Sequence, residues 1–284
     1  MNMKSAFSPK TMSPWAQCFI GWIILLTLIP TILIFLMSLL NTKSYGVISW
    51  QPTLLNYARL FDWTYLNLFL KTIALSLGAT LTCLLVGFPV AYYLARVSGW
   101  KRTLGLILLF IPFWTNFILR IHAVIALVGN SGLINQALLG LGLIDQPIEL
   151  LYTRTGVFIG LAYNYLPFLV IPLFSSLEKF DLTLREAALD LGANRIQTFW
   201  LVLLPNIRHG LIIGSLFVFI PMMGEYVIPD LLGGGKDMYL GNLMVNQFFV
   251  MQDWPFGAAI ASVLSVGLIF ALVIQYRWES KTDG

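Results

Sequence analysis

The stretch EKFDLTLREAALDLGANRIQTFWLVLLPNIR, Glu178–Arg208, is the one long polar segment inside a chain otherwise made of apolar runs. Its acids and bases are Glu178, Asp181, Glu186, Asp190, Lys179, Arg185, Arg195 and Arg208. Over the whole chain, hydrophobic residues occupy 58% of 284 positions and charged residues only 11%, against about one quarter in soluble domains. So few charges do not cover a water-facing surface, and we expect lipid to solvate much of the chain.

Six apolar segments are long enough to cross a membrane, because a helix needs about 20 residues to span a hydrocarbon core of roughly 30 Å. Their backbone must be helical, since lipid offers no partners to free N–H and C=O groups. The predicted spans are approximately 18–40, 72–95, 103–125, 156–175, 210–228 and 255–274, and Asp253 and Pro255 suit the start of the last one. The sequence therefore predicts an all-α integral membrane protein, a single transmembrane domain over 1–284 with a loop at 178–208.

The basic residues are distributed unevenly between the two sides that these spans define. With the N-terminus inside, eleven of the 17 Lys and Arg residues fall on the cytoplasmic side, where such residues are enriched. We therefore expect both termini and the polar stretch in the cytoplasm. This topology explains the basic balance without a nucleic-acid partner. Cys18 and Cys83 lie inside apolar spans, so we expect no disulfide and no metal site.

The first half of the polar stretch is predicted to be a short helix. Thr183–Glu186 fits a capping box, so the helix should run over Leu184–Leu191 and end at Gly192 in the left-handed conformation. Two interpretations remain open from the residues alone. The helix is either a solvated connector whose Glu186 only caps, or a docking element whose small Ala187–Ala188 lets another protein approach closely.

A motif of fixed spacing runs from this helix to the next apolar segment. Its members are Glu186-Ala187-Ala188, Gly192 after three residues, Val202 after nine more, and Leu204-Pro205 after one. The pattern resembles the EAA loop of ABC importer permeases, with Val202 in place of isoleucine. The resemblance implies a type I importer permease architecture in which Glu186, Ala187, Ala188, Gly192, Leu204 and Pro205 couple the chain to a dimer of ATPase subunits. Those partners would bind ATP and Mg, so this chain would hold no cofactor.

Further motifs make the chain similar to the permeases of spermidine/putrescine importers. They are Pro112–Asn116, Gly142–Asp145, Leu231–Gly234 and Asp253–Pro255. The resemblance extends from Asn56 onward and implies a multi-pass subunit of the bacterial inner membrane that moves polyamines by alternating access. The implied partners are a second, distinct permease chain, a periplasmic substrate-binding protein and a small cationic substrate. The chain would then be no enzyme, because ATP is hydrolysed by another subunit.

One carboxylate of the fifth span is a candidate contact for such a cation. Residues spaced to share one helix face are Gly210, Gly214, Val218, Pro221 and Glu225. Small residues mark the face that packs closely on a neighbour, so Glu225 should face the bundle rather than lipid. Pro221 also frees the carbonyl of Phe217. The alternative roles of Glu225 are to pair with Arg120 or to reach the outer interface.

Five weaker candidates surround this position. Tyr226 and Asp230 follow Glu225 in the chain, and Trp114, Asn116 and Tyr163 lie in the third and fourth spans. Aromatic rings and carboxylates both attract cations. In membrane proteins, however, aromatic residues more often pack or form the interfacial belt.

Three other functions are alternatives to the polyamine importer. An importer for thiamine, iron, an amino-acid derivative or an oxyanion would share the coupling loop, and an anion site would need a path arginine such as Arg120. An ion-coupled carrier would also show a broken helix and an intramembrane acid, although it would lack the coupling motif. A membrane enzyme lacks support because His122 and His209 form no cluster.

The glycine-rich turn before Lys236 is followed by Asp237 and does not fit a P-loop.

Overall fold

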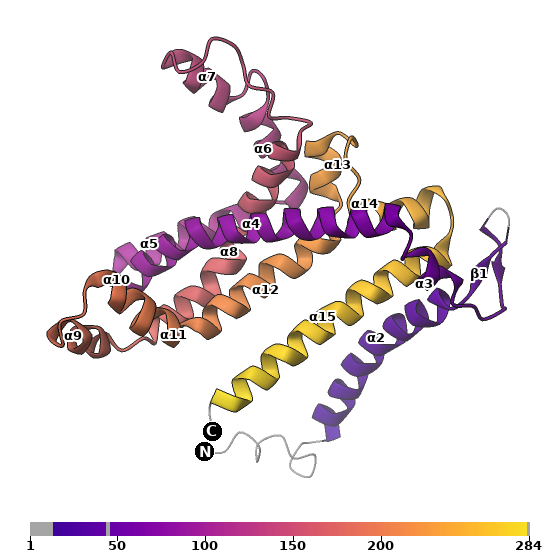
Figure 1. Cartoon of the computed structure of the whole chain (residues 1–284), viewed down its shortest axis with the longest axis horizontal. Helices are drawn as coiled ribbons and strands as arrows, with labels where there is room; N and C mark the ends of the chain where they lie inside the picture. Colours follow the sequence, from indigo (N-terminus) through magenta and orange to yellow (C-terminus); the bar gives the residue numbers. More distant parts are fainter. Residues whose placement is uncertain (1–13, 44–45, 283–284) are drawn as a thin grey trace. The chain divides into compact units, whose positions relative to one another are not determined.

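The structure is a computed structural model that describes residues 14–43 and 46–282 and consists almost entirely of helices (Figure 1). Within these residues, five helices are long and apolar enough to cross a membrane, and a bent pair provides a sixth if it counts as one span. A short antiparallel hairpin joins β1 (Asn41–Thr42) to β2 (Ile48–Ser49). The all-α, multi-span class is therefore confirmed. The side on which the termini lie stays a prediction.

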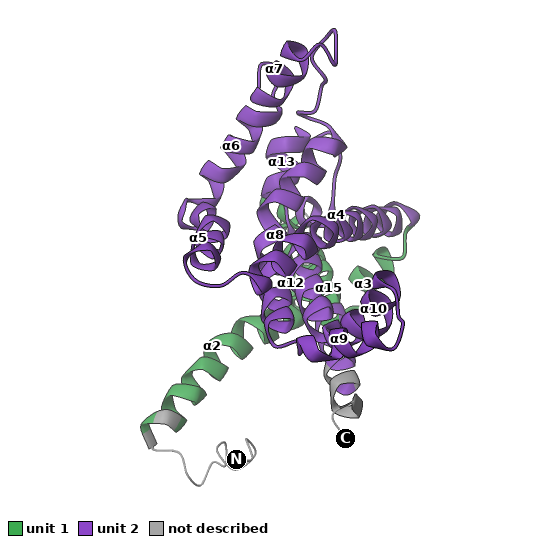
Figure 2. Cartoon of the chain, turned by 90° about the vertical axis from the view of Figure 1, so that its left-hand side faces the viewer, with its two compact units in different colours: residues 1–62, 244–266 green, residues 63–243, 267–284 purple. Residues whose placement is uncertain are grey.

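The chain divides into two compact units, which are coloured separately in Figure 2 and are described here one at a time. Unit 1 is residues 1–62 and 244–266, and unit 2 is residues 63–243 and 267–284. Unit 1 holds α2 (Pro14–Ser38), the hairpin, α3 (Leu55–Arg59), η3 (Asn246–Val250) and the first part of α15 (Trp254–Thr282). A single transmembrane domain over 1–284 stays a prediction.

Most of the long helices belong to unit 2. In chain order, they and their connections are α4 (Trp63–Arg96), α5 (Trp100–Trp114), α6 (Phe117–Val128), α7 (Leu133–Gly140), α8 (Arg154–Glu178), α9 (Leu182–Asp190), α10 (Arg195–Thr198), η2 (Phe199–Leu203), α11 (Leu204–Asn206), α12 (Arg208–Gly224) and α13 (Val227–Gly233). The short α14 (Leu240–Val245) follows. Compared with the predicted second span, 72–95, α4 begins nine residues earlier, at Trp63.

Helix α8 lies at the centre of unit 2, because α4, α12 and α13 all pack against it. Leu169 and Leu173 on α8 are completely buried. Two glycines allow the α12 backbone to come close. A Cβ on Gly214 would lie 3.0 Å from the Leu169 carbonyl oxygen, and one on Gly210 would lie 2.6 Å from Ser176 Cβ. The prediction that Gly210 and Gly214 mark a closely packed face is therefore confirmed.

The third span is not the continuous helix predicted over 103–125. Helix α5 ends where Thr115 becomes extended, with ψ of 152°, and α6 starts after Asn116. The Asn116 side chain accepts a hydrogen bond from the Ile118 N–H at 2.8 Å, so the new helix start is capped. The apolar pattern did not reveal this break because it continues through Phe117 and Ile118 on the far side.

The fifth span also differs from the prediction of 210–228. Helix α12 follows a bend of 70° that separates it from 195–206, and it ends at Gly224. Glu225 is extended, with ψ of 130°, and α13 begins as a separate helix two residues later. Glu225 therefore does not continue the helix face of Gly210 and Gly214 as predicted. It lies in the break, where its carboxylate is used to cap α13.

In unit 1, Asp253 joins three segments that are distant in sequence. Its carboxylate accepts hydrogen bonds from Arg59 Nη1 at 2.8 Å, Thr42 Oγ1 at 2.8 Å and the Phe256 N–H at 3.3 Å. The Arg59 guanidinium also lies 3.9 Å from the centroid of the Phe256 ring. The last bond caps the start of α15, which confirms the prediction that a helix starts at this position.

The packing of α12 on α8 makes a specific prediction about Gly210. Gly210→Ala adds a Cβ that overlaps Ser176 and the Pro172 carbonyl, so the two backbones must separate at a cost of about 1–3 kcal/mol. We expect a lower midpoint of thermal unfolding in detergent, followed by size exclusion after heating. Gly21→Ala is the control because a Cβ there meets nothing within 4 Å. Equal midpoints for the two variants would contradict the packing argument.

Candidate coupling helix and solute site

The helix predicted over Leu184–Leu191 is α9, which runs from Leu182 to Asp190. Its N-cap is Asp181, whose side chain accepts a hydrogen bond from the Thr183 N–H at 2.9 Å. The predicted capping box of Thr183 and Glu186 is therefore wrong. The acid two residues before Thr183 caps the helix instead, because carboxylates and hydroxyls compete for the same N–H groups.

Because Asp181 caps α9, the Glu186 carboxylate is not used as a cap. Its side chain is exposed, and within residues 14–43 and 46–282 it makes no hydrogen bond or ion pair. Ala187 is also exposed, and Ala188 is half-buried. The interpretation in which Glu186 only caps the helix is therefore wrong, and a small-residue surface beside a free carboxylate remains.

Gly192 ends α9 as predicted. It has φ of +89°, in the left-handed region that side chains other than glycine rarely occupy. The Gly192 N–H donates to the Leu189 carbonyl at 2.9 Å, and the Ala193 N–H donates to the Ala188 carbonyl at 3.0 Å. These two bonds form a Schellman motif. They fix the direction in which the chain leaves the helix.

The second half of the polar stretch consists of α10, η2 and α11. A capping box starts it, in which Asn194 Oδ1 accepts from the Gln197 N–H and Gln197 Oε1 accepts from the Asn194 N–H, at 2.8 and 2.9 Å. Pro205 lies in the short α11, and the bend comes at Ile207. The helical path runs directly from η2 into α11, so Pro205 removes one N–H from a continuous helical segment.

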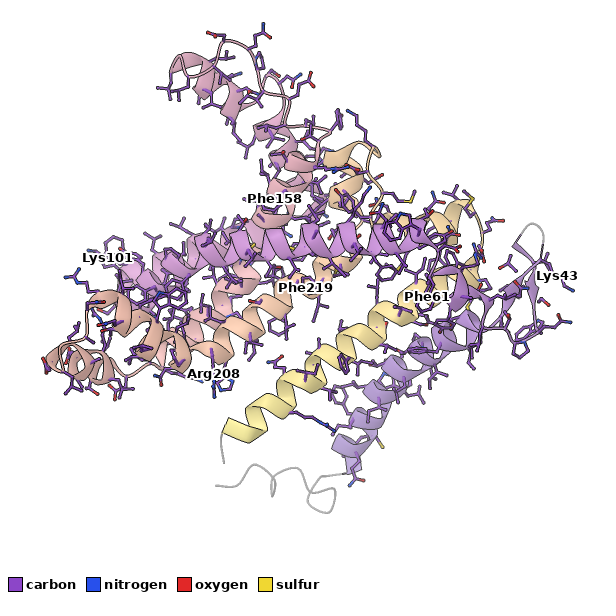
Figure 3. All side chains as sticks on the ribbon, viewed as in Figure 1. Lys43, Phe61, Lys101, Phe158, Arg208 and Phe219 are labelled. Carbon is purple, nitrogen blue, oxygen red and sulfur yellow. The ribbon has the colours of Figure 1, made fainter. Side chains whose placement is uncertain are left out.

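A pocket that the sequence did not indicate separates these helices from α4. It has a volume of about 250 Å³ and is lined by Phe88, Tyr92, Arg185, Leu189, Arg195, Thr198, Phe199 and Leu203. The Phe88 and Phe199 rings meet edge to face with centroids 5.5 Å apart. Figure 3 labels Lys101 and Arg208 at this same end of unit 2.

At the other end of α12, the Glu225 carboxylate accepts three hydrogen bonds. The donors are the Tyr165 hydroxyl at 2.7 Å, the Val227 N–H at 2.9 Å and the Ile228 N–H at 3.4 Å. The side chain is half-buried. The Glu225 backbone is buttressed as well, since a Cβ on Gly241 would overlap its carbonyl group. The break between α12 and α13 is thus fixed by specific hydrogen bonds and close packing, unlike a frayed helix end.

Arg120 does not pair with Glu225, although that pairing was one of the alternatives considered. No described carboxylate lies within 4 Å of its guanidinium. The guanidinium carbon instead lies 4.4 Å from the centroid of Phe113 and 5.6 Å from that of Phe117. Arg120 is therefore held at the break between α5 and α6 by aromatic faces.

Aromatic rings connect the two breaks across α8. Phe113 meets Phe168 edge to face with centroids 5.1 Å apart, and Phe168 lies 6.1 Å from Tyr165. Tyr165 in turn donates to Glu225. The sequence did not indicate Tyr165, Phe168 or the orientation of Phe113, because their partners lie on other helices. Phe113 alone belongs to a quoted motif, Pro112–Asn116.

The structure does not gather the remaining predicted solute residues at this cluster. Trp114 is 89% exposed, and the Asn116 oxygen is occupied as a cap. Tyr163 lines a different, apolar hollow of about 300 Å³ beside Cys83. Tyr226 and Asp230 follow the break and are exposed. We call Phe113, Phe168 and Tyr165 the aromatic chain, because each ring contacts the next. Among the predicted residues, only Glu225 contacts it.

The glycine-rich turn after α13 has a structural explanation. Gly234 has φ of +62° and caps α13, and a Cβ there would overlap the Tyr152 ring. Beyond the turn, Asp237 accepts hydrogen bonds from Arg154 Nε at 2.7 Å and Nη2 at 3.0 Å. The Arg154 guanidinium holds the pKa of Asp237 below its usual range, and burial raises the pKa of the Tyr239 hydroxyl.

Comparison with known proteins places this architecture in a family. The spermidine/putrescine transport system permease protein PotB of Escherichia coli (strain K12) is 41% identical over 258 residues, covering 91% of this chain and 94% of that protein. PotB of Haemophilus influenzae (strain ATCC 51907 / DSM 11121 / KW20 / Rd) is 38% identical and covers 90% of each chain. No family model matches the chain.

A solved structure has the same fold. It is the bacterial alginate ABC transporter in complex with alginate pentasaccharide-bound periplasmic protein, with a TM-score of 0.61, 16% identity, and coverage of 92% of this chain and 95% of that chain. At this identity the likeness concerns the fold alone, whereas the identity to the two permeases extends over nearly the whole chain. The chain therefore belongs to the family of ABC importer permeases that includes the spermidine/putrescine transport system permease proteins.

Proposed function

We propose that this chain is the transmembrane permease subunit of an ATP-driven importer that moves spermidine and putrescine across the bacterial inner membrane by alternating access. The observation that carries the proposal is 41% identity to a spermidine/putrescine permease over 91% of the chain. In this proposal both termini and α9 lie on the cytoplasmic side, in agreement with the distribution of Lys and Arg.

The proposed assembly supplies everything that the chain lacks. A dimer of ATPase subunits binds ATP and Mg and receives α9, and a second, distinct permease encloses the path. A periplasmic binding protein delivers the solute, by analogy with the alginate transporter, whose structure includes such a protein. The free Glu186 carboxylate and the exposed Ala187 support α9 as the contact for the ATPase. The fixed exit at Gly192 supports it as a rigid element that transmits movement.

Glu225 is the proposed contact for the cation. A carboxylate at a helix break beside the Tyr165 hydroxyl can accept an ammonium group, and aromatic faces nearby add cation–π attraction. An intramembrane acid normally marks a solute or ion path. Its three present bonds are to hydrogen-bond donors without charge, so the negative charge remains available to a cation.

An oxyanion importer is the second candidate function. The observation in its favour is Arg120, which lies at the α5–α6 break with no described carboxylate within 4 Å. The acidic side chain Glu225 belongs to the same aromatic chain and argues against an anion there.

The solute class is tested by reconstituting the complex with its co-purifying partners and cognate binding protein. We expect spermidine and putrescine to stimulate ATP hydrolysis and to accumulate in the vesicles, while sulfate and thiamine do neither. Stimulation by sulfate with no response to either polyamine would replace the first candidate by the second.

Glu225→Gln tests the solute contact, since it keeps the capping oxygen for Val227 and removes the charge. Losing a charge-assisted contact of about 1.5–3 kcal/mol should lower uptake at limiting polyamine by roughly tenfold or more. Glu149→Gln, at an exposed loop position, is the matched control and should transport normally. Unchanged uptake by Glu225→Gln at equal membrane levels would eliminate Glu225 from the path.

Glu186→Lys tests the docking of α9. The side chain has no partner within the described residues, so the permease should remain as stable as the parent while ATPase co-purification and transport are lost. Asp145→Lys makes the same charge change on an exposed loop and should retain both.

Gly192→Pro is a second docking variant, because proline cannot adopt φ of +89°. It should reorient the exit from α9 and also release the ATPase. Normal ATPase retention by both Glu186→Lys and Gly192→Pro would show that α9 is not the contact.

A further inference from the structure

Among the described residues, Arg120 has no acidic partner, and one of its hydrogen-bond donors is unused. Within the described residues its Nε is buried without a hydrogen-bond partner, and a buried donor left unpaired is costly. It also lies near the N-terminus of α6, where the helix dipole favours negative rather than positive charge. What holds the guanidinium is the ring of Phe113, 4.4 Å away, with Phe117 at 5.6 Å.

The group that would satisfy Arg120 lies at the far end of the same aromatic chain. Phe113, Phe168 and Tyr165 lead in successive ring contacts to the Glu225 carboxylate. Within the described residues Arg120 makes no ion pair with Glu225, whose carboxylate accepts hydrogen bonds from the neutral Tyr165 hydroxyl and the α13 N–H groups. The cluster therefore holds one cation and one carboxylate, each engaged by a different partner.

We propose that Arg120 is a resident cation of the solute site, which competes with the imported cation for the Phe113 face and repels it from Glu225. This inference rests on the proposed polyamine function. Its consequence is that Arg120 weakens the hold of the membrane site on its solute, so that the solute is released instead of being trapped. Arg120 would thus determine specificity through charge and not through shape.

The repulsion depends on the charge of the solute. Coulomb energy is proportional to the product of the charges, and spermidine carries one more ammonium group than putrescine. Neutralising Arg120 should therefore strengthen the binding of spermidine more than that of putrescine. A purely structural role for Arg120 predicts no such difference, because loss of packing would affect both solutes alike.

The experiment measures equilibrium binding of radiolabelled spermidine and putrescine to the complete transporter in nanodiscs, without nucleotide and without the binding protein. For Arg120→Gln we expect tighter binding of spermidine, on the order of 5- to 10-fold, and a smaller gain for putrescine. Arg120→Lys keeps the charge and should retain the parental ratio of the two affinities. Arg154→Gln, which removes a positive charge at the Asp237 ion pair, should change neither affinity.

Assembly is checked by co-elution with the ATPase subunits. If Arg120→Gln does not assemble, Arg120→Met is measured in its place, since it is unbranched and removes both the charge and the unpaired donor. Unchanged or weaker spermidine binding by an assembled neutral variant would overturn the inference, and so would equal gains for both solutes. If the parental complex transports polyamines, such a result leaves the proposed function intact. If the parental complex neither binds nor transports polyamines, the proposed function fails and the inference with it.

Discussion

The need to pair every backbone N–H and C=O group inside lipid governs this chain. Helices meet that need within their own length, which is why the described structure consists almost entirely of helices. A helix break inside the membrane is tolerated only where something else supplies the missing partners. In unit 2, Asn116 supplies them at the start of α6 and Glu225 supplies them at the start of α13. At both breaks, a side-chain oxygen accepts a hydrogen bond from a backbone N–H group at the start of the next helix.

These two breaks position Arg120 and Glu225, the charged residues of the candidate solute site. A residue inside a regular helix presents its side chain from a continuous cylinder, whereas an extended residue such as Glu225 can fold its side chain back over the next helix. That is how one carboxylate both caps α13 and reaches Tyr165 on α8. On the other side of the aromatic chain, Arg120 is held by Phe113 rather than by an acid. Opposite charges are therefore kept in one cluster without neutralising each other.

Helix α12 connects the Glu225 break to the polar stretch that holds α9, α10 and α11. It begins after the bend at Ile207, immediately beyond α11, and ends at Gly224 beside Glu225. Gly210 and Gly214 lack side chains, so the α12 backbone packs directly against α8 at these two positions. A helix packed so closely moves as a rigid body more readily than it bends. If α9 receives the ATPase as proposed, α12 is the rigid element that joins the polar stretch to the Glu225 carboxylate.

The sequence by itself determined the helical class, the approximate spans, the left-handed exit at Gly192 and the close-packed glycine face, because each follows from local hydropathy, φ preference or spacing. It also indicated Glu225, since an acid within an apolar span stands out in one dimension. The tertiary structure decided what that acid contacts, where the third and fifth spans break, and that Asp181 rather than Thr183 caps α9. Tyr165 meets Glu225 across 60 positions of sequence, and Arg120 lies against an aromatic ring, a contact that the sequence did not indicate. Such pairings arise from the way helices pack side by side, and no local pattern in the chain encodes them.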